Sequence, residues 1–153
     1  MKEYPISFND EMVRAIVEGR KTQTRRPLKP QPDIGKADWR NEGWTWTKYM
    51  GYPCGHGVPI SPYGGSGDRL FIKSEPSIIL EIKRVLVKQL HDMTAEDSKA
   101  EGCVLPKKIG YEQFGKSMYL PVFKNLWDTI YAEKGFAWDT NPFVWVIEFE
   151  RVL

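Results

Sequence analysis

The chain has 153 residues, a charged fraction of 27% and a formal net charge of +2. This length predicts a single domain over residues 1–153 and excludes a second independent core. The small net charge excludes a uniformly basic coat for nucleic acid, so any attraction to phosphate has to come from a local cluster.

Cysteine content and apolar segments predict the compartment. Two cysteines, Cys54 and Cys103, are too few for a disulfide framework and are typical of a protein in a reducing cytoplasm. The first residues lack the apolar run of a signal peptide, and no apolar segment approaches the roughly 20 residues that span a bilayer. We therefore expect a cytoplasmic protein with no membrane partner.

The first predicted helix covers residues 9–18, after a short extended segment over residues 4–8. Asn9 is a good N-cap, and Gly19 allows the left-handed conformation that ends a helix. Apolar side chains recur on one face of this helix at i, i+3 and i+4 spacing, namely Met12, Ala15 and Ile16.

A basic cluster overlaps the end of this helix. Between positions 14 and 29 there are six basic side chains and one acid. The cluster is either a solvated face or a site that attracts a phosphate-bearing ligand. Lys21 and Thr24 would point to opposite faces of a regular strand, so a turn or bulge after Gly19 has to bring them together. The basic residues are Arg14, Arg20, Lys21, Arg25, Arg26 and Lys29.

The segment 27–67 differs in character from the rest of the chain. It is rich in proline and glycine, shows no sustained periodicity, and contains Trp39, Trp44 and Trp46. We interpret it as a long excursion with one hairpin through residues 44–47. A loop this long is more often functional or disordered than neutral, and its tryptophans favour a lid or a contact surface.

Two strands are predicted after the excursion, over residues 69–75 and 77–90. In the second strand, apolar residues alternate up to Ile82 and continue from Val85 on a shifted phase. A phase shift of one residue predicts a β-bulge between these two positions.

A short helix is predicted over residues 94–102. Thr94 is its N-cap, Asp97 completes a capping box, and Gly102 ends it. Glu101 lies at the end of this helix, where the helix dipole disfavours a carboxylate. An acid in that position invites a functional explanation.

The clearest helix is predicted between Pro121 and Gly135, after a polar loop over residues 104–117. An alternating strand over residues 143–150 closes the chain. The apolar stripe of the helix is expected to be core, and it consists of Phe123, Leu126, Trp127, Ile130 and Tyr131.

The order of these elements predicts the fold class. Strands of mixed spacing with two or three helices, and no regular βαβ alternation, indicate an α+β domain with a mainly antiparallel sheet. Closure into a small barrel is the economical arrangement because it removes exposed edges. No internal repeat or low-complexity tract appears in the sequence.

Common metal and cofactor motifs do not fit the sequence. Cys54 and His56, with His91 or Cys103, lack the paired spacing of a zinc site, so we predict no metal. The glycine run at 64–67 lacks the Lys-Ser/Thr of a phosphate-binding loop, and no cofactor is expected. Neither cysteine carries a local signature of a Cys-His nucleophile.

The remaining candidates for catalysis are Lys21, Thr24 and Arg26, together with a carboxylate from another part of the chain. A threonine hydroxyl attacks only if a base takes its proton, and a lysine is that base only if burial or nearby cations lower its pKa. A glutamate facing this group would move protons on an amine leaving group, or accept a hydrogen bond from a nucleobase amine. The alternative is structural, with Lys21 and Glu101 forming an ordinary ion pair.

The segment 19–26, with Lys21, Thr24 and Arg26, resembles the G-x-K-x-x-[E/T]-x-R signature of ASCH domains. These domains are members of the PUA-like superfamily of small β-barrels associated with RNA. The resemblance covers most of the chain and points to a phage and prophage branch of ASCH proteins. The similar segments are residues 8–9, 19–26, 67–70, 94–102, 126–128 and 141–149.

The chain also resembles the small bacterial N4-acetylcytidine amidohydrolases, whose catalytic residues would fall on Lys21, Thr24 and Glu101. The resemblance implies that Thr24 attacks the acetyl carbonyl, that Lys21 activates it or stabilises the oxyanion, and that Glu101 shuttles protons. This chain departs from those enzymes in its 27–67 excursion and in offering a rival acid, Glu75.

Three functions are therefore in competition. The first is an amidohydrolase for N4-acylated cytidine, with substrate binding by Arg20, Arg25, Arg26 and Glu75. The second is a non-catalytic module that binds single-stranded RNA through the basic cluster and the tryptophans. The third is a phage accessory protein that binds a host partner through the 39–46 surface. The sequence carries no signal for the oligomeric state.

Overall fold

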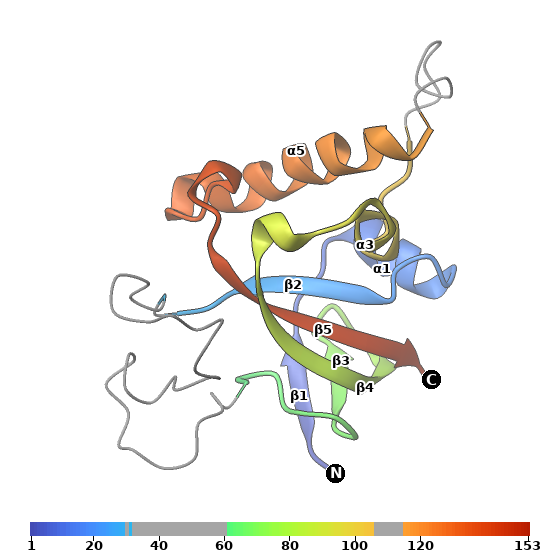
Figure 1. Ribbon diagram of the computed structural model, residues 1–153. Helices are drawn as coiled ribbons and strands as arrows, with labels where there is room; N and C mark the ends of the chain where they lie inside the picture. Colours follow the sequence, from blue (N-terminus) through green and yellow to red (C-terminus); the bar gives the residue numbers. More distant parts are fainter. Residues whose placement is uncertain (30, 32–60, 106–114) are drawn as a thin grey trace.

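The computed structural model describes residues 1–29, 31, 61–105 and 115–153 (Figure 1). Within these residues one five-stranded sheet packs with three α-helices and short 3-10 turns. The elements are β1 Glu3–Ile6, α1 Asp10–Val17, β2 Gln23–Pro27, β3 Arg69–Ile72, β4 Glu75–Gln89, η2 Leu90–Asp92, α3 Ala95–Ala100, η3 Gly115–Met118, α5 Tyr119–Tyr131, η4 Ala132–Lys134, η5 Trp138–Thr140 and β5 Phe143–Arg151.

The sheet has the strand order β1-β3-β4-β5-β2. The β1–β3 pair is parallel and the other three pairs are antiparallel, so the predicted α+β class and mainly antiparallel sheet are confirmed. The predicted barrel is wrong, because no pairing joins the edge strands β1 and β2 in the part of the chain that the structure describes. These edge strands are only four and five residues long, and short edges present little unpaired backbone.

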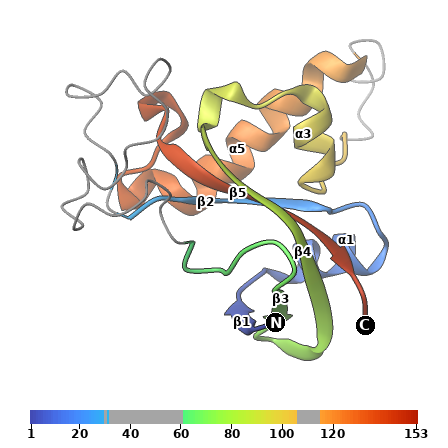
Figure 2. The same cartoon turned by 60° about the horizontal axis from the view of Figure 1, so that its bottom comes forward.

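Strand β4 is the longest element of the sheet. Its first part forms a hairpin with β3, and its remainder pairs with β5 up to Gln89↔Phe143. The register shifts between Ile82 and Arg84, which confirms the predicted bulge. Figures 1 and 2 show the result, a curved strand that runs from the β3 hairpin to the side covered by α5. The predicted break at Pro76 is wrong, because the strand begins at Glu75.

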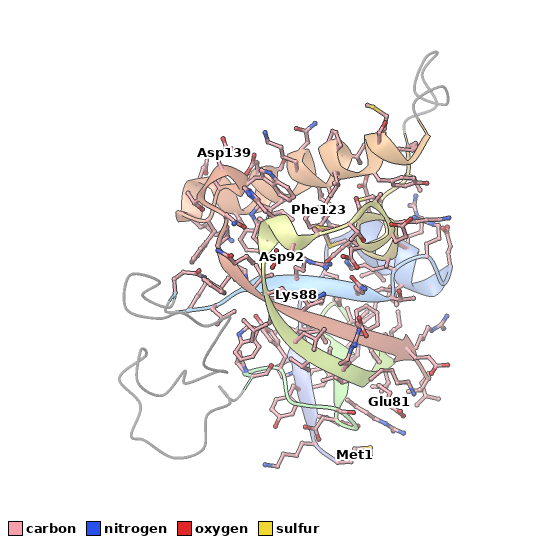
Figure 3. The ribbon with its side chains drawn as sticks, in the orientation of Figure 1. Met1, Glu81, Lys88, Asp92, Phe123 and Asp139 are labelled. Atoms are coloured by element: carbon pink, nitrogen blue, oxygen red, sulfur yellow. The ribbon has the colours of Figure 1, made fainter. Side chains whose placement is uncertain are left out.

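Strand β5 lies between two cores. Its residues Phe143, Trp145, Ile147 and Phe149 belong to the core that β1, β3, β4 and α1 share. Val144 and Val146 alternate with them and are buried on the other face, under α5. Figure 3 labels Phe123 between α5 and the sheet, and this side chain is buried in that second core. The alternating strand is therefore confirmed, with both faces covered.

The predicted helix caps are confirmed, although α5 begins at Tyr119, before Pro121, and ends at Tyr131. Asn9 accepts a hydrogen bond from the backbone N–H of Met12, and Gly19 follows α1 with φ of +79°. Thr94 and Asp97 form a capping box at the start of α3, which precedes Gly102. Helix α5 contains Pro121 in its first turn, and the chain beyond it turns at Gly135 with φ of +88°.

Several predictions fall on residues whose structure is not described. The hairpin at 44–47, the surface around Trp39, and the residues Cys54 and His56 lie outside the described ranges. Among the described helices, none has both the length and the apolar character to cross a membrane.

Candidate functional site

Lys21 and Glu101 meet at the point where α1, β2 and α3 come together. After the turn at Gly19, Lys21 forms an isolated antiparallel bridge with Glu101, which is the C-cap of α3. Lys21 Nζ donates hydrogen bonds to Glu101 Oε2 at 2.8 Å and to the Glu101 backbone oxygen at 2.9 Å. Both side chains are buried, with exposed fractions of 0% and 4%. The acid at the unfavourable end of α3 is thus held by a buried cation.

Gly102 makes this close approach sterically acceptable. Its φ of +95° is a conformation that side-chain-bearing residues rarely adopt. A Cβ atom at this position would lie 3.1 Å from the Cβ atoms of both Ala15 and Lys21. A larger residue here would push α3 away from Lys21.

Arg25 holds the other side of the same carboxylate. Its Nη1 donates to Glu101 Oε1 at 3.0 Å and to Gln23 Oε1 at 2.9 Å, while Nη2 lies 3.4 Å from Asp97 Oδ2. The exposed fraction of Arg25 is only 4%. We call Lys21, Arg25, Asp97 and Glu101 the buried network. Each oxygen of Glu101 therefore has its own cation.

Burial dominates the electrostatics of Lys21. Removal from water lowers the pKa of its amine below the usual 10.5, and the neighbouring Glu101 opposes this shift only in part. For Asp97, burial raises the pKa, but hydrogen bonds from Thr94 and Gln23 and the charge of Arg25 outweigh it, so the pKa of this carboxyl is lowered. The network thus favours an ionised Asp97 and a lysine that gives up its proton more readily than usual.

A pocket of about 350 Å³ opens beside the network. Polar side chains of β2 and Glu101 line one part of it, and apolar and aromatic side chains of α1 and α5 line the rest. The lining residues are Ser7, Phe8, Asn9, Met12, Thr24, Arg25, Arg26, Glu101, Phe123, Leu126, Trp127, Ile130 and Tyr131.

Thr24 lies in β2 opposite Ile147 and lines this pocket. Its hydroxyl has no hydrogen-bond partner among the described residues, although the residue is only 3% exposed. Lys21 does not line the pocket. The two residues are therefore connected through Glu101, which faces the pocket and is bonded to Lys21 on its other side.

Arg26 follows Thr24 and Arg25 on β2 and lies at the edge of the pocket. Its Nη2 donates to the backbone oxygen of Ser7 at 2.7 Å, and its guanidinium carbon is 5.1 Å from the centroid of the Phe8 ring. Tyr131 of α5 lies beside this guanidinium. Burial raises the pKa of the Tyr131 phenol, and Arg26 opposes that shift only in part.

The structure separates the predicted binding residues. Arg20 bonds to Glu18 and to the backbone oxygen of Gly102, outside the pocket lining. Arg25 lines the pocket, but its guanidinium is engaged by the acids of the buried network. Glu75 is exposed at the start of β4, opposite Ile72, and does not line the pocket. Of the two rival acids, Glu101 is the one in contact with Lys21.

The prediction that the apolar stripe of α5 is core is confirmed, because Phe123 and Trp127 are buried in the second core and Tyr131 packs against it. What the sequence did not indicate is that Trp127 and Tyr131, with ring centroids 4.2 Å apart, also line the pocket. The available signal was the phenol of Tyr131 at the end of an apolar stripe, because a buried tyrosine hydroxyl needs a polar partner.

The described residues contain no group of three or more side chains suited to hold a metal ion. Cys103 is a free, buried thiol whose pKa is raised by burial, and a raised pKa disfavours the nucleophilic thiolate. The described part of the site therefore offers hydroxyl, amine and carboxylate chemistry.

Solved structures similar to this chain include two bacterial proteins. A protein from Enterococcus faecalis V583, assigned to the family DUF984, matches with a TM-score of 0.53 and 14% identity over 99% of this chain and 81% of that chain. An ASCH domain from Lactobacillus crispatus JV V101 matches with a TM-score of 0.49 and 13% identity over 98% of this chain and 79% of that chain. The Enterococcus match shows a shared fold. No family model and no curated protein matches the chain.

Proposed function

We propose that this protein binds a nucleoside with an N-acylated exocyclic amine, of the N4-acetylcytidine type, and hydrolyses its amide bond. The observation that carries the proposal is the joint presence of Thr24 and Glu101 in one aromatic-walled pocket, with Glu101 bonded to the buried Lys21. A hydroxyl without a partner beside a carboxylate–amine pair is the arrangement that acyl transfer to a threonine requires.

The pocket suits a single nucleoside in size and chemistry. Its volume of about 350 Å³ is at the lower end of the range for small-molecule sites, roughly 300–1,000 Å³. The aromatic side chains of Phe8, Trp127 and Tyr131 line the pocket, and Tyr131, the least buried of the three, offers a ring against which a base can stack. The carboxylate of Glu101 is an acceptor for the N4–H donor of a cytosine ring.

The reaction proceeds in two steps in this proposal. Thr24 Oγ1 attacks the acyl carbonyl carbon, its proton passes to the Lys21–Glu101 pair, and the electron pair of the C=O bond moves to oxygen. When this electron pair re-forms the C=O bond, the bond from the acyl carbon to N4 breaks. N4 takes the proton from Lys21–Glu101 and leaves as the free amine. Water then hydrolyses the threonine ester, which gives the carboxylic acid and restores the Thr24 hydroxyl.

Membership of the ASCH domains, their phage and prophage branch, and a cytoplasmic location are parts of the same proposal. They rest on the 19–26 signature and on the wider set of similar segments. The fold shared with the Enterococcus protein is consistent with the proposal but does not bear on chemistry.

The direct test is the ultraviolet absorbance of N4-acetylcytidine incubated with the purified protein, together with the release of acetate. Thr24→Val removes the hydroxyl with almost no change of shape, and we expect turnover to be lost while cytidine still quenches tryptophan fluorescence. Thr22→Val is the matched control, because Thr22 is an exposed threonine two residues away. Turnover by the Thr24→Val protein at the rate of this control would contradict the proposal.

A second function, RNA binding without catalysis, is favoured by the cation of Arg26 at the edge of a pocket with aromatic walls. It is distinguished in the same experiment. A protein that binds a cytidine-containing single strand in a salt-sensitive manner, yet leaves N4-acetylcytidine intact, is the binding module and not the hydrolase.

A further inference from the structure

The proposed hydrolysis places negative charge on the acyl oxygen, and this charge needs hydrogen-bond donors. The two cations of the buried network are engaged elsewhere. Lys21 donates twice to Glu101, and Arg25 is bonded to Gln23, Asp97 and Glu101. Lys21 does not line the pocket, and the guanidinium of Arg25 is already bonded to protein side chains.

Arg26 differs from these two cations. In the described part of the chain, its guanidinium donates from Nη2 to the backbone oxygen of Ser7 and is hydrogen-bonded to the Tyr131 hydroxyl, and none of these bonds goes to a carboxylate. The 2.7 Å bond to Ser7 and the Phe8 ring 5.1 Å away fix the guanidinium at the edge of the pocket. A donor that is held in place before the reaction is what stabilisation of an oxyanion requires.

Tyr131 of α5 provides a second donor, next to Arg26. Its ring packs against Trp127, with centroids 4.2 Å apart, and it lines the pocket beside Arg26. Because burial raises the pKa of this phenol, the hydroxyl keeps its proton at neutral pH and can donate it in a hydrogen bond. One donor thus comes from β2 and the other from α5.

We infer that Arg26 and Tyr131 together bind the acyl carbonyl oxygen and stabilise the negative charge that forms on it when Thr24 attacks. This inference rests on the proposed hydrolysis. It makes both side chains catalytic residues, and it gives the pocket face of α5 a part in the reaction.

The test is steady-state hydrolysis of N4-acetylcytidine with kcat and KM measured separately. Removal of one oxyanion donor lowers kcat by about 10²–10³-fold, and we expect losses of this order from Tyr131→Phe and Arg26→Gln with KM almost unchanged. Arg26→Lys keeps the charge and is expected to retain part of kcat. Arg84→Gln changes an exposed arginine that does not line the pocket and is the matched control, expected to behave as the unmodified protein.

Tyr131→Phe keeps the ring and its packing against Trp127, so its melting temperature should equal that of the unmodified protein. A kcat of this variant within threefold of the Arg84→Gln value would overturn the role of Tyr131. The same result for Arg26→Gln would overturn the role of Arg26.

A binding experiment separates failure of this inference from failure of the proposed function. Cytidine that carries a methylphosphonyl group on N4 has tetrahedral, negatively charged oxygens in place of the planar carbonyl. We expect Tyr131→Phe and Arg26→Gln to weaken its binding by about tenfold or more, and to leave cytidine binding unchanged. If the unmodified protein hydrolyses N4-acetylcytidine but both variants bind the analogue normally, the inference fails and the proposed function stands. If it hydrolyses nothing and binds the analogue no better than cytidine, both fail.

Discussion

Two clusters of ion pairs in this protein have similar distances between the charged atoms but differ in their exposure to solvent. In the buried network, Lys21 and Glu101 are 2.8 Å apart with exposed side-chain fractions of 0% and 4%. On the outer side of β4 and β5, Arg84 and Glu148 are also 2.8 Å apart, but their exposed fractions are 59% and 27%. We call the pairs formed by Glu81, Lys83, Arg84, Glu148 and Glu150 the surface ladder, and Figure 3 labels one member, Glu81.

The distance between two charges does not by itself determine how much an ion pair stabilises the fold. Surface charges are solvated whether or not they are paired, so their attraction adds little to stability and is screened by salt. Lys21, Arg25 and Glu101 are almost completely removed from solvent, so water does not replace a lost partner and removal of one leaves the others uncompensated. The contacts of the buried network therefore fix the position of Glu101 in the site whenever the protein is folded.

The largest effect is expected from Glu101→Gln. The substitution keeps the shape but turns an amide donor toward Lys21 or Arg25, and it leaves two buried cations without their shared anion. We expect the free energy of unfolding, measured in urea at neutral pH, to fall by about 3–5 kcal/mol. The control is Glu150→Gln, which changes an exposed member of the surface ladder. An equal change in the two variants would refute the distinction between the clusters.

A smaller but more diagnostic effect concerns pH. Because burial lowers the pKa of folded Lys21, the unfolded chain binds more protons between that lowered pKa and 10.5, so the lysine makes stability rise with pH in this window. Lys83 has a raised pKa through its hydrogen bonds to Glu81 and Glu150, so its contribution is present below 10.5 and is lost as pH rises through the raised value.

The two lysines are compared by measuring unfolding of Lys21→Met and Lys83→Met from about pH 8 to about pH 11. Relative to Lys21→Met, the unmodified protein should gain stability as the pH rises. Relative to Lys83→Met, it should lose stability at the upper end. Parallel curves for the two variants would show that Lys21 titrates like a surface lysine.

The smallest effect is expected from Arg84→Gln. The raised pKa of this guanidinium comes from its hydrogen bonds to Glu148, yet both groups keep access to water. We expect a change in melting temperature close to the error of the measurement, and none at high salt. A loss comparable to that of Glu101→Gln would mean that the surface ladder carries more stability than its exposure allows.

Much of the fold was predictable because its signals are local. The caps at Asn9 and Thr94, the turn at Gly19 and the bulge after Ile82 each depend on residues within a few positions of one another. Backbone sterics and side-chain hydrogen bonds act over the same short range, so the sequence shows them directly. The pocket wall on α5 was not distinguishable from core, because an apolar stripe has the same spacing in both cases.

Local sequence patterns predicted the helices, most of the strands and the reactive side chains, namely a threonine, a lysine and two alternative glutamates. The packing of distant elements accounts for the rest: the sheet is open, Arg25 is buried as a partner of Glu101, and Glu101 rather than Glu75 contacts Lys21. Lys21 and Glu101 are separated by 80 positions in the chain. Contacts of that separation depend on how whole elements pack, and local patterns of side chains carry no record of them.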